Sequence, residues 1–248
     1  MSSSPPAPPS PDDPARPGPG PGESYREFRR PIAVLVLCTG TAGFLDAFAF
    51  LRYGTFVANQ SGNLIFLGIG PAGWHPAWPA AGASLLAFAA AAGVVSWIRS
   101  LPGRWSPALR GLAATTLGLS LWTFLNVLLH HGQDGPVSRA VLAAAGGLAT
   151  GAFTTLFVRT AGVKTTITYQ SGTVVKTGGY IVRWIAAPGT DRNRARQASL
   201  LGLLTLVCYS IGGGIGAVAQ QRPHWVPAWG LLALVPVALL VRRVRTGT

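Results

Sequence analysis

Long apolar runs separated by short polar segments make up the chain after its first 30 residues. Six runs lie near residues 32–51, 78–98, 110–129, 140–158, 199–219 and 225–241. Each approaches or exceeds the roughly 17–25 helical residues that cross the ~30 Å hydrocarbon core of a bilayer. The pattern predicts an all-α membrane protein with six transmembrane helices.

The two ends of the chain are polar. Residues 1–22 contain nine prolines together with Gly, Ser and Asp, a composition that buries too little apolar surface to offset the entropy of ordering. We predict a disordered cytoplasmic tail over residues 1–30 and a basic cytoplasmic tail over 242–248. The first segment lacks the features of a secretory signal, so the first apolar run should act as an anchor.

Composition and charge agree with a membrane protein. Hydrophobic residues make up 49% of the chain and charged residues 11%, with a net charge of +13. The basic residues flank the apolar runs and form no stripe interleaved with aromatics, which argues against a nucleic-acid partner. Only Arg52, Arg139 and Arg222 of the 20 basic residues fall opposite the N-terminus. The positive-inside rule therefore places both termini in the cytoplasm, and we expect a bacterial inner membrane.

A short motif occurs twice, about 110 residues apart. Gln60-Ser61-Gly62-Asn63-Leu64 corresponds to Gln170-Ser171-Gly172-Thr173-Val174. The halves 31–130 and 131–241 each contain three predicted spans, and an odd number of spans makes the second half enter the membrane from the opposite side. This predicts two inverted three-helix repeats, a plan found in many secondary transporters.

Asp46 is the only carboxylate within a predicted span. A mid-span Asp costs about 2.5–3.5 kcal/mol on translocon scales, so it needs a partner or a polar cavity. One interpretation is a proton- or cation-coupling site. The alternative is a structural Asp that pairs with Arg52 or bonds a Ser or Thr on another helix.

Polar residues around each motif are candidates for a substrate site. After the first span, the apolar run Leu64–Ile69 is too short to cross a bilayer and predicts a re-entrant half-helix capped by Ser61 or Asn63. The alternatives are an extracellular loop with a surface helix for the first copy and a solvated cytoplasmic loop for the second. The candidate binding residues are Asn59, Gln60, Ser61, Gly62, Asn63, Thr168, Gln170, Ser171, Gly172 and Thr173.

Other motifs indicate packing rather than catalysis. The pairs Gly147 with Gly151 and Gly212 with Gly216 have the spacing of close helix contacts. No nucleotide-binding loop, metalloprotease motif or nucleophile elbow is present, so we expect neither an enzyme nor a cofactor. His75, His130, His131 and His224 resemble interfacial anchors more than metal ligands.

Two segments carry a family resemblance. Thr41–Ala47 followed by Phe56–Leu64, and later Thr165–Thr173, resemble the two motifs of the bacterial YoaK family, a domain of unknown function numbered 1275. The family usually has Thr where this chain has Ser61 and Ser171, so the hydroxyl is retained. The resemblance covers roughly residues 32–241 and implies a multi-pass bacterial membrane protein with no established activity.

The leading functional hypothesis is a small-molecule secondary transporter or permease of unknown substrate, coupled to protons or cations through Asp46. The competing hypothesis is a non-transporting scaffold or assembly factor that binds partner helices. A passive channel is a third alternative. The expected partners are the lipid bilayer and a small-molecule substrate, and homo-oligomer formation is left open.

Overall fold

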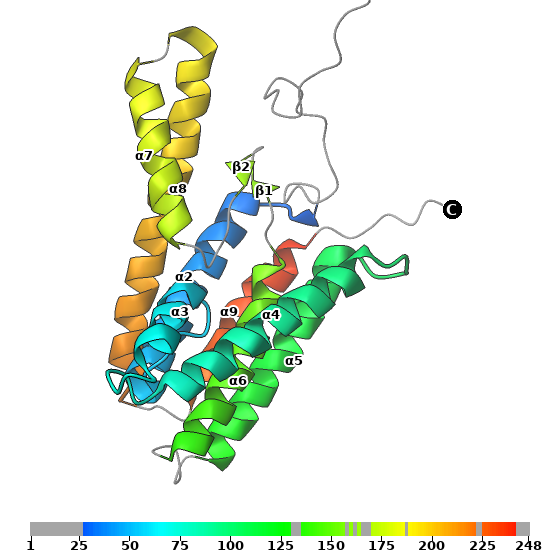
Figure 1. Ribbon diagram of the computed structural model, residues 1–248. Coiled ribbons are helices and arrows are strands. Elements are labelled where there is room, and N and C mark those ends of the chain that lie inside the picture. The colour runs from blue at the N-terminus through cyan, green and yellow to red at the C-terminus, as the bar shows by residue number, and fades with distance from the viewer. Residues whose placement is uncertain are drawn as a thin grey trace, which may run out of the picture.

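The chain folds into a helical bundle in the computed structural model, which describes residues 27–129, 135–156, 159–160, 163–164, 170–186, 188–221 and 225–241. The helices are α2 (Pro31–Tyr53), α3 (Gln60–Ile69), α4 (Trp78–Ser100), α5 (Pro107–Leu128), α6 (Pro136–Thr154), α7 (Gln170–Ala186), α8 (Gly189–Ala219) and α9 (Val226–Leu240) (Figure 1). Two short strands, β1 (Arg159–Thr160) and β2 (Val163–Lys164), pair antiparallel between α6 and α7.

Six of these helices coincide with the six predicted apolar runs. Among the described residues, α2, α4, α5, α6 and α8 are long and apolar enough to cross a membrane. The sixth, α9, has only 15 residues and contains Pro236, so it rises about 22 Å. Large apolar side chains on the bundle surface, such as Leu86 and Leu117 at 73% and 72% exposure, suit contact with lipid.

Proline sets the start of most of these helices. A proline lies within the first two positions of α2, α4, α5, α6 and α9, where its missing N–H breaks no intrahelical hydrogen bond. At α5 the Ser106 hydroxyl also accepts a hydrogen bond from the Leu109 amide at 3.3 Å. The local sequence thus fixes where the spans begin.

Helix packing depends on glycines at close contacts. α6 packs on α4 and α8 packs on α2, and a Cβ added at Gly151 or Gly212 would overlap the carbonyl oxygen of Phe88 or Gly40 respectively. Gly147 and Gly216 make the same kind of contact. The close packing predicted from the glycine spacing is therefore confirmed, and these small faces are used within the chain rather than left for partner helices.

The two ends of the described bundle meet at one face. The Arg29 amide donates a hydrogen bond to the Leu240 carbonyl at 2.8 Å, and Phe28 is fully buried. At the same end, Glu27 accepts the guanidinium of Arg99 at 2.8 Å. Residues 27–30, which the sequence placed in the disordered tail, therefore pack against the bundle, because Phe28 supplies apolar surface that the proline-rich segment lacks.

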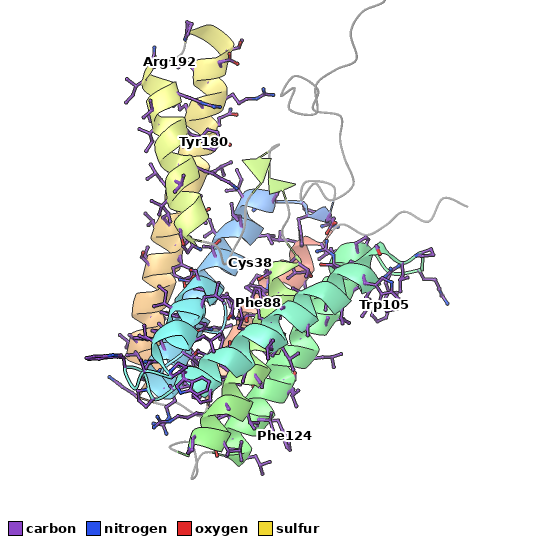
Figure 2. The ribbon with its side chains drawn as sticks, in the orientation of Figure 1. Cys38, Phe88, Trp105, Phe124, Tyr180 and Arg192 are labelled. Carbon is purple, nitrogen blue, oxygen red and sulfur yellow. The ribbon has the colours of Figure 1, made fainter. Side chains whose placement is uncertain are left out.

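Helices α7 and α8 form a hairpin that extends beyond the other helices (Figure 1). The 31 residues of α8 rise about 46 Å, well beyond a ~30 Å hydrocarbon core. The run predicted over 199–219 therefore starts ten residues earlier, at Gly189. Figure 2 shows Tyr180 and Arg192 on this hairpin, far from Trp105 and Phe124 at the α4–α5 side.

Candidate functional site

The chain folds back beside α2 after that helix ends. Gly54 takes the left-handed conformation, with φ of 72°, that terminates α2. Its carbonyl accepts a hydrogen bond from Nε2 of His75 at 2.8 Å, and the His75 ring stacks on Phe66 with centroids 3.9 Å apart. These contacts join the beginning and end of residues 54–75, which include the whole of α3.

The carboxylate of Asp46 receives four hydrogen bonds. Its Oδ1 accepts from the amides of Val57 at 2.8 Å and Ala58 at 2.6 Å. Its Oδ2 accepts from the Asn59 amide at 2.8 Å and from the Tyr209 hydroxyl. Asp46 is only 2% exposed. The donors are thus three consecutive backbone amides and a tyrosine on α8, and neither Arg52 nor a Ser or Thr hydroxyl is one of these four donors.

The position of Asp46 on α2 shows how far the chain runs back along that helix after Tyr53. Asp46 lies seven residues before Tyr53, the last residue of α2, which is about 10 Å along the helix axis. Because the amides at 57–59 bond to Asp46, the segment 54–59 runs back by about that length before α3 begins. Residues 54–69 therefore form a returning segment, an extended arm followed by a short helix, beside α2 and against α4 (Figure 1).

The side chain of Asn63, on α3, forms hydrogen bonds with the extended arm. Its Oδ1 accepts from the Thr55 hydroxyl at 2.7 Å and the Phe56 amide at 3.0 Å. Its Nδ2 donates to the Phe56 carbonyl and to Oε1 of Gln60, both at 2.7 Å. All four side-chain hydrogen bonds are internal to the returning segment, so Asn63 has a structural role and is fully buried.

Two neighbouring helices also bind the arm. From α4, the Ser84 hydroxyl donates to the Phe56 carbonyl at 2.8 Å. From α6, the Thr150 hydroxyl donates to the Val57 carbonyl, which also accepts from Nε2 of Gln60 at 2.7 Å. Backbone groups that a non-helical arm exposes are thus satisfied by side chains of three other helices.

The predicted capping residues are wrong. Asn59 is the N-cap of α3 and its side chain makes no capping bond, while Ser61 and Asn63 lie inside the helix. The carboxylate of Asp46 instead accepts from the amide of Asn59, the N-cap residue, and from the amides of Val57 and Ala58 before it. A negative charge in that position also stabilises the positive end of α3.

Asn59 and Ser61 are the polar side chains left at the tip of the returning segment. Both are half-buried, and the Ser61 hydroxyl donates to Oδ1 of Asn59 at 2.8 Å. Within the described part of the chain, Nδ2 of Asn59 has no acceptor. Gly62 packs against the Phe56 ring, where an added Cβ would come within 2.6 Å. The tip thus offers a fixed amide donor beside a hydroxyl.

The second motif has different neighbours from the first. Gln170 is buried at the first position of α7, Ser171 is exposed, and Gly172 and Thr173 are half-buried in the same first turn. α7 packs along α8, whereas α3 packs along α4. Thr168 lies outside the described residues. A helix begins at the glutamine of each motif, Gln60 or Gln170, but α7 has 17 residues whereas α3 has 10.

Several residues of this site escaped the sequence analysis. Tyr209, Ser84 and Thr150 bond to the returning segment from α8, α4 and α6. Each is one of several polar residues in a mostly apolar helix, so the sequence offers only a weak signal for it. Tyr53 is a similar case, because its hydroxyl donates to Oδ1 of Asn126 on α5 at 2.7 Å.

The described residues hold no cluster of possible metal ligands, since no three His, Cys, Asp or Glu side chains come together there. His75 takes part in the closure of the returning segment, while His130, His131 and His224 lie outside the described residues.

Comparison with known proteins shows a family match over most of the chain. The family model described as a protein of unknown function, DUF1275, matches residues 34–241, which cover every helix described above except the first three residues of α2. No curated protein and no solved structure matches the chain.

Proposed function

The chain belongs to the DUF1275 family of proteins of unknown function, and on that premise we propose that it is a small-molecule secondary transporter or permease of the bacterial inner membrane. The match confirms the family resemblance of the two sequence motifs. The family description assigns no activity, so the proposal rests on the site itself.

The returning segment 54–69 is the observation that carries the proposal. Non-helical backbone at membrane depth is tolerated only where it is packed in protein or lines a cavity. Transporters use such broken elements to bring helix ends and polar side chains to a site near the middle of the bilayer. In this chain the arm places Asn59 and Ser61 about 10 Å inward from the end of α2.

The packing pattern supports two inverted halves. α2 on α8 corresponds to α6 on α4, α3 on α4 corresponds to α7 on α8, and α9 on α2 corresponds to α5 on α6. These pairs are the ones that a pseudo-two-fold axis would exchange. With the basic residues concentrated at the face where the two ends meet, the proposal places that face in the cytoplasm.

Within this proposal Asn59 and Ser61 bind the solute and Asp46 holds them in place. The unsatisfied Nδ2 of Asn59 favours a solute with a carbonyl, carboxylate or hydroxyl acceptor. Gln170 at the start of α7 is the matching candidate from the second half. The coupling role of Asp46 stays a prediction, because its four hydrogen bonds already account for its burial.

Cysteine labelling tests the position of the tip. In a chain with Cys38 and Cys208 replaced by alanine, Ser61→Cys should react slowly with an impermeant thiol reagent. The controls are Ala72→Cys and Ser100→Cys, at exposed positions near opposite ends of α4. Equal and rapid labelling of Ser61→Cys and Ala72→Cys, from one side only, would mean that residues 54–69 form an ordinary surface loop.

A flux experiment then tests transport directly. Proteoliposomes loaded with a defined mixture of amino acids, sugars, nucleosides and organic acids are assayed by mass spectrometry for solutes lost through the wild type. Asn59→Ala should abolish the loss of the transported solute and leave the purified protein folded. Retention of every solute in the mixture by the wild type, with and without a proton or sodium gradient, would count against a transporter of these solute classes.

A further inference from the structure

An apolar groove lies between α8 and α9, with α2 at its base. Its volume is about 420 Å³, within the range of roughly 300–1,000 Å³ typical of small-ligand pockets. Its lining residues are Val36, Leu37, Gly40, Thr41, Phe44, Cys208, Ile211, Gly212, Ile215, Trp229, Gly230 and Ala233. Ile211, Ile215 and Trp229 are 58%, 55% and 52% exposed, so the groove opens on the outer surface of the bundle.

The lining offers almost nothing to a polar solute. None of the lining residues carries a charge. The hydroxyl of Thr41 already donates to the Leu37 carbonyl at 2.8 Å, and Cys208 behaves as a small hydrophobe in such surroundings. The groove is also distinct from the returning segment, which contributes none of its lining residues. Its chemistry selects a hydrocarbon ligand.

The groove is long enough to hold part of an alkyl chain. Its α8 wall, from Cys208 to Ile215, rises about 10 Å. The charge at the end of the groove, rather than its width, then indicates the occupant.

Two arginines lie at one end of the groove. Arg29 and Arg30 are exposed immediately before α2, and Arg30 precedes Val36 by six residues, about 9 Å along the helix. The α9 wall leads to the same place, because Leu240 at its end bonds to the Arg29 amide. The interfacial layer of a bilayer is about 5–8 Å thick per leaflet, so a lipid with its chain in the groove would place its phosphate beside these arginines.

We propose that this groove binds an anionic phospholipid, with one acyl chain between α8 and α9 and the headgroup at Arg29 and Arg30. Basic residues at the cytoplasmic ends of transmembrane helices favour anionic headgroups. The hydrocarbon chain supplies the apolar surface that fills the groove. This inference is independent of the transport proposal, since it uses none of the residues at the returning segment.

Native mass spectrometry of the purified full chain tests the proposal. The protein in mild detergent is titrated with phosphatidylglycerol or with phosphatidylcholine carrying the same oleoyl chains. We expect the wild type to retain phosphatidylglycerol preferentially. Ala233→Phe should abolish retention by filling the groove. Arg29→Gln with Arg30→Gln should lower the affinity about 25-fold, from about fivefold for each arginine, and remove the preference over phosphatidylcholine.

Matched variants separate these effects from general ones. Ala90→Phe makes the same change at an exposed position of α4, and Arg104→Gln removes an exposed arginine between α4 and α5. Neither should alter retention. Equal binding of the two lipids by the wild type, unchanged binding by Ala233→Phe, or equal losses in the control variants would overturn the proposal. A lipid-free dimer that Ala233→Phe dissociates would overturn it in favour of a second copy of the chain.

A second measurement needs no change in the groove. Cys208 lines it and is partly exposed, whereas Cys38 is fully buried. Phosphatidylglycerol should therefore slow the reaction of Cys208 with a small membrane-permeant maleimide, and phosphatidylcholine should slow it much less. Labelling rates that do not differ between the two lipids would contradict the assignment even if Ala233→Phe failed to fold.

Discussion

Replacing Asp46 with asparagine separates an anchoring role from a coupling role. The wild-type carboxylate accepts four hydrogen bonds, two on each oxygen. Asparagine keeps one acceptor oxygen and turns the other position into an NH2 donor. If its oxygen faces Val57 and Ala58, its NH2 group faces the Asn59 amide, and two donors then oppose each other. The hydroxyl of Tyr209 can rotate and accept instead.

The expected loss of stability in Asp46→Asn follows from these four hydrogen bonds. A hydrogen bond to a charged group contributes about 1.5–3 kcal/mol and one between neutral groups about 0.5–1.5 kcal/mol, so the two retained bonds together weaken by about 2 kcal/mol. The unsatisfied amide costs a further 1–3 kcal/mol or so. Asp46→Asn should thus lower the free energy of unfolding by about 3–5 kcal/mol. For a chain of this size that corresponds to a thermal midpoint about 10 °C lower.

Thermal unfolding in detergent, followed by tryptophan fluorescence, measures this loss. Tyr209→Phe removes one donor and should lower the midpoint by about half as much. In the Asp46→Asn background, Ser61→Cys should also label faster, since the arm is no longer held. A midpoint within 2 °C or so of the wild type, with unchanged labelling, would refute the anchoring role. If that stable variant also lost transport, the coupling role predicted from the sequence would hold instead.

Two further predictions concern the bundle around the site. Gly212→Ala should lower the thermal midpoint, because its Cβ would overlap the Gly40 carbonyl, whereas Gly214→Ala, with no atom within 4 Å, should leave it equal or raise it; equal effects of the two would contradict the packing. Burial raises the pKa of Glu27 above its usual range, against the opposing effect of Arg99. Because the pKa of Glu27 is higher in the folded state, the protein loses stability as the pH rises from about 4.5, the ordinary value for Glu, through the folded pKa. The free energy of unfolding of the wild type should therefore fall relative to that of Glu27→Gln over this range. A thermal midpoint that rises relative to Glu27→Gln over the same range would show that the Arg99 pair outweighs burial.

The apolar runs of the sequence determined the helices of the bundle. Their length and the prolines at their starts are local properties, which is why the runs near 32–51 and 78–98 reappear as α2 and α4 with small shifts. The glycine spacing on α6 and α8 likewise predicted close packing, because residues four apart lie on one face of a helix. The short apolar run Leu64–Ile69 was enough to predict a helix too short to span.

Only the tertiary structure decided what the polar residues do. Asp46 bonds to amides 11–13 residues ahead and to a tyrosine 163 residues away. A backbone amide carries no sequence signature, so no pattern could identify these partners or show that Asp46, rather than Ser61 or Asn63, bonds the amide of the N-cap residue of α3. The groove between α8 and α9 is likewise completed by α2, a helix from a distant part of the chain. The groove forms only when these helices pack. Apolar composition does not predict it, because side chains that face lipid and side chains buried in protein are equally apolar.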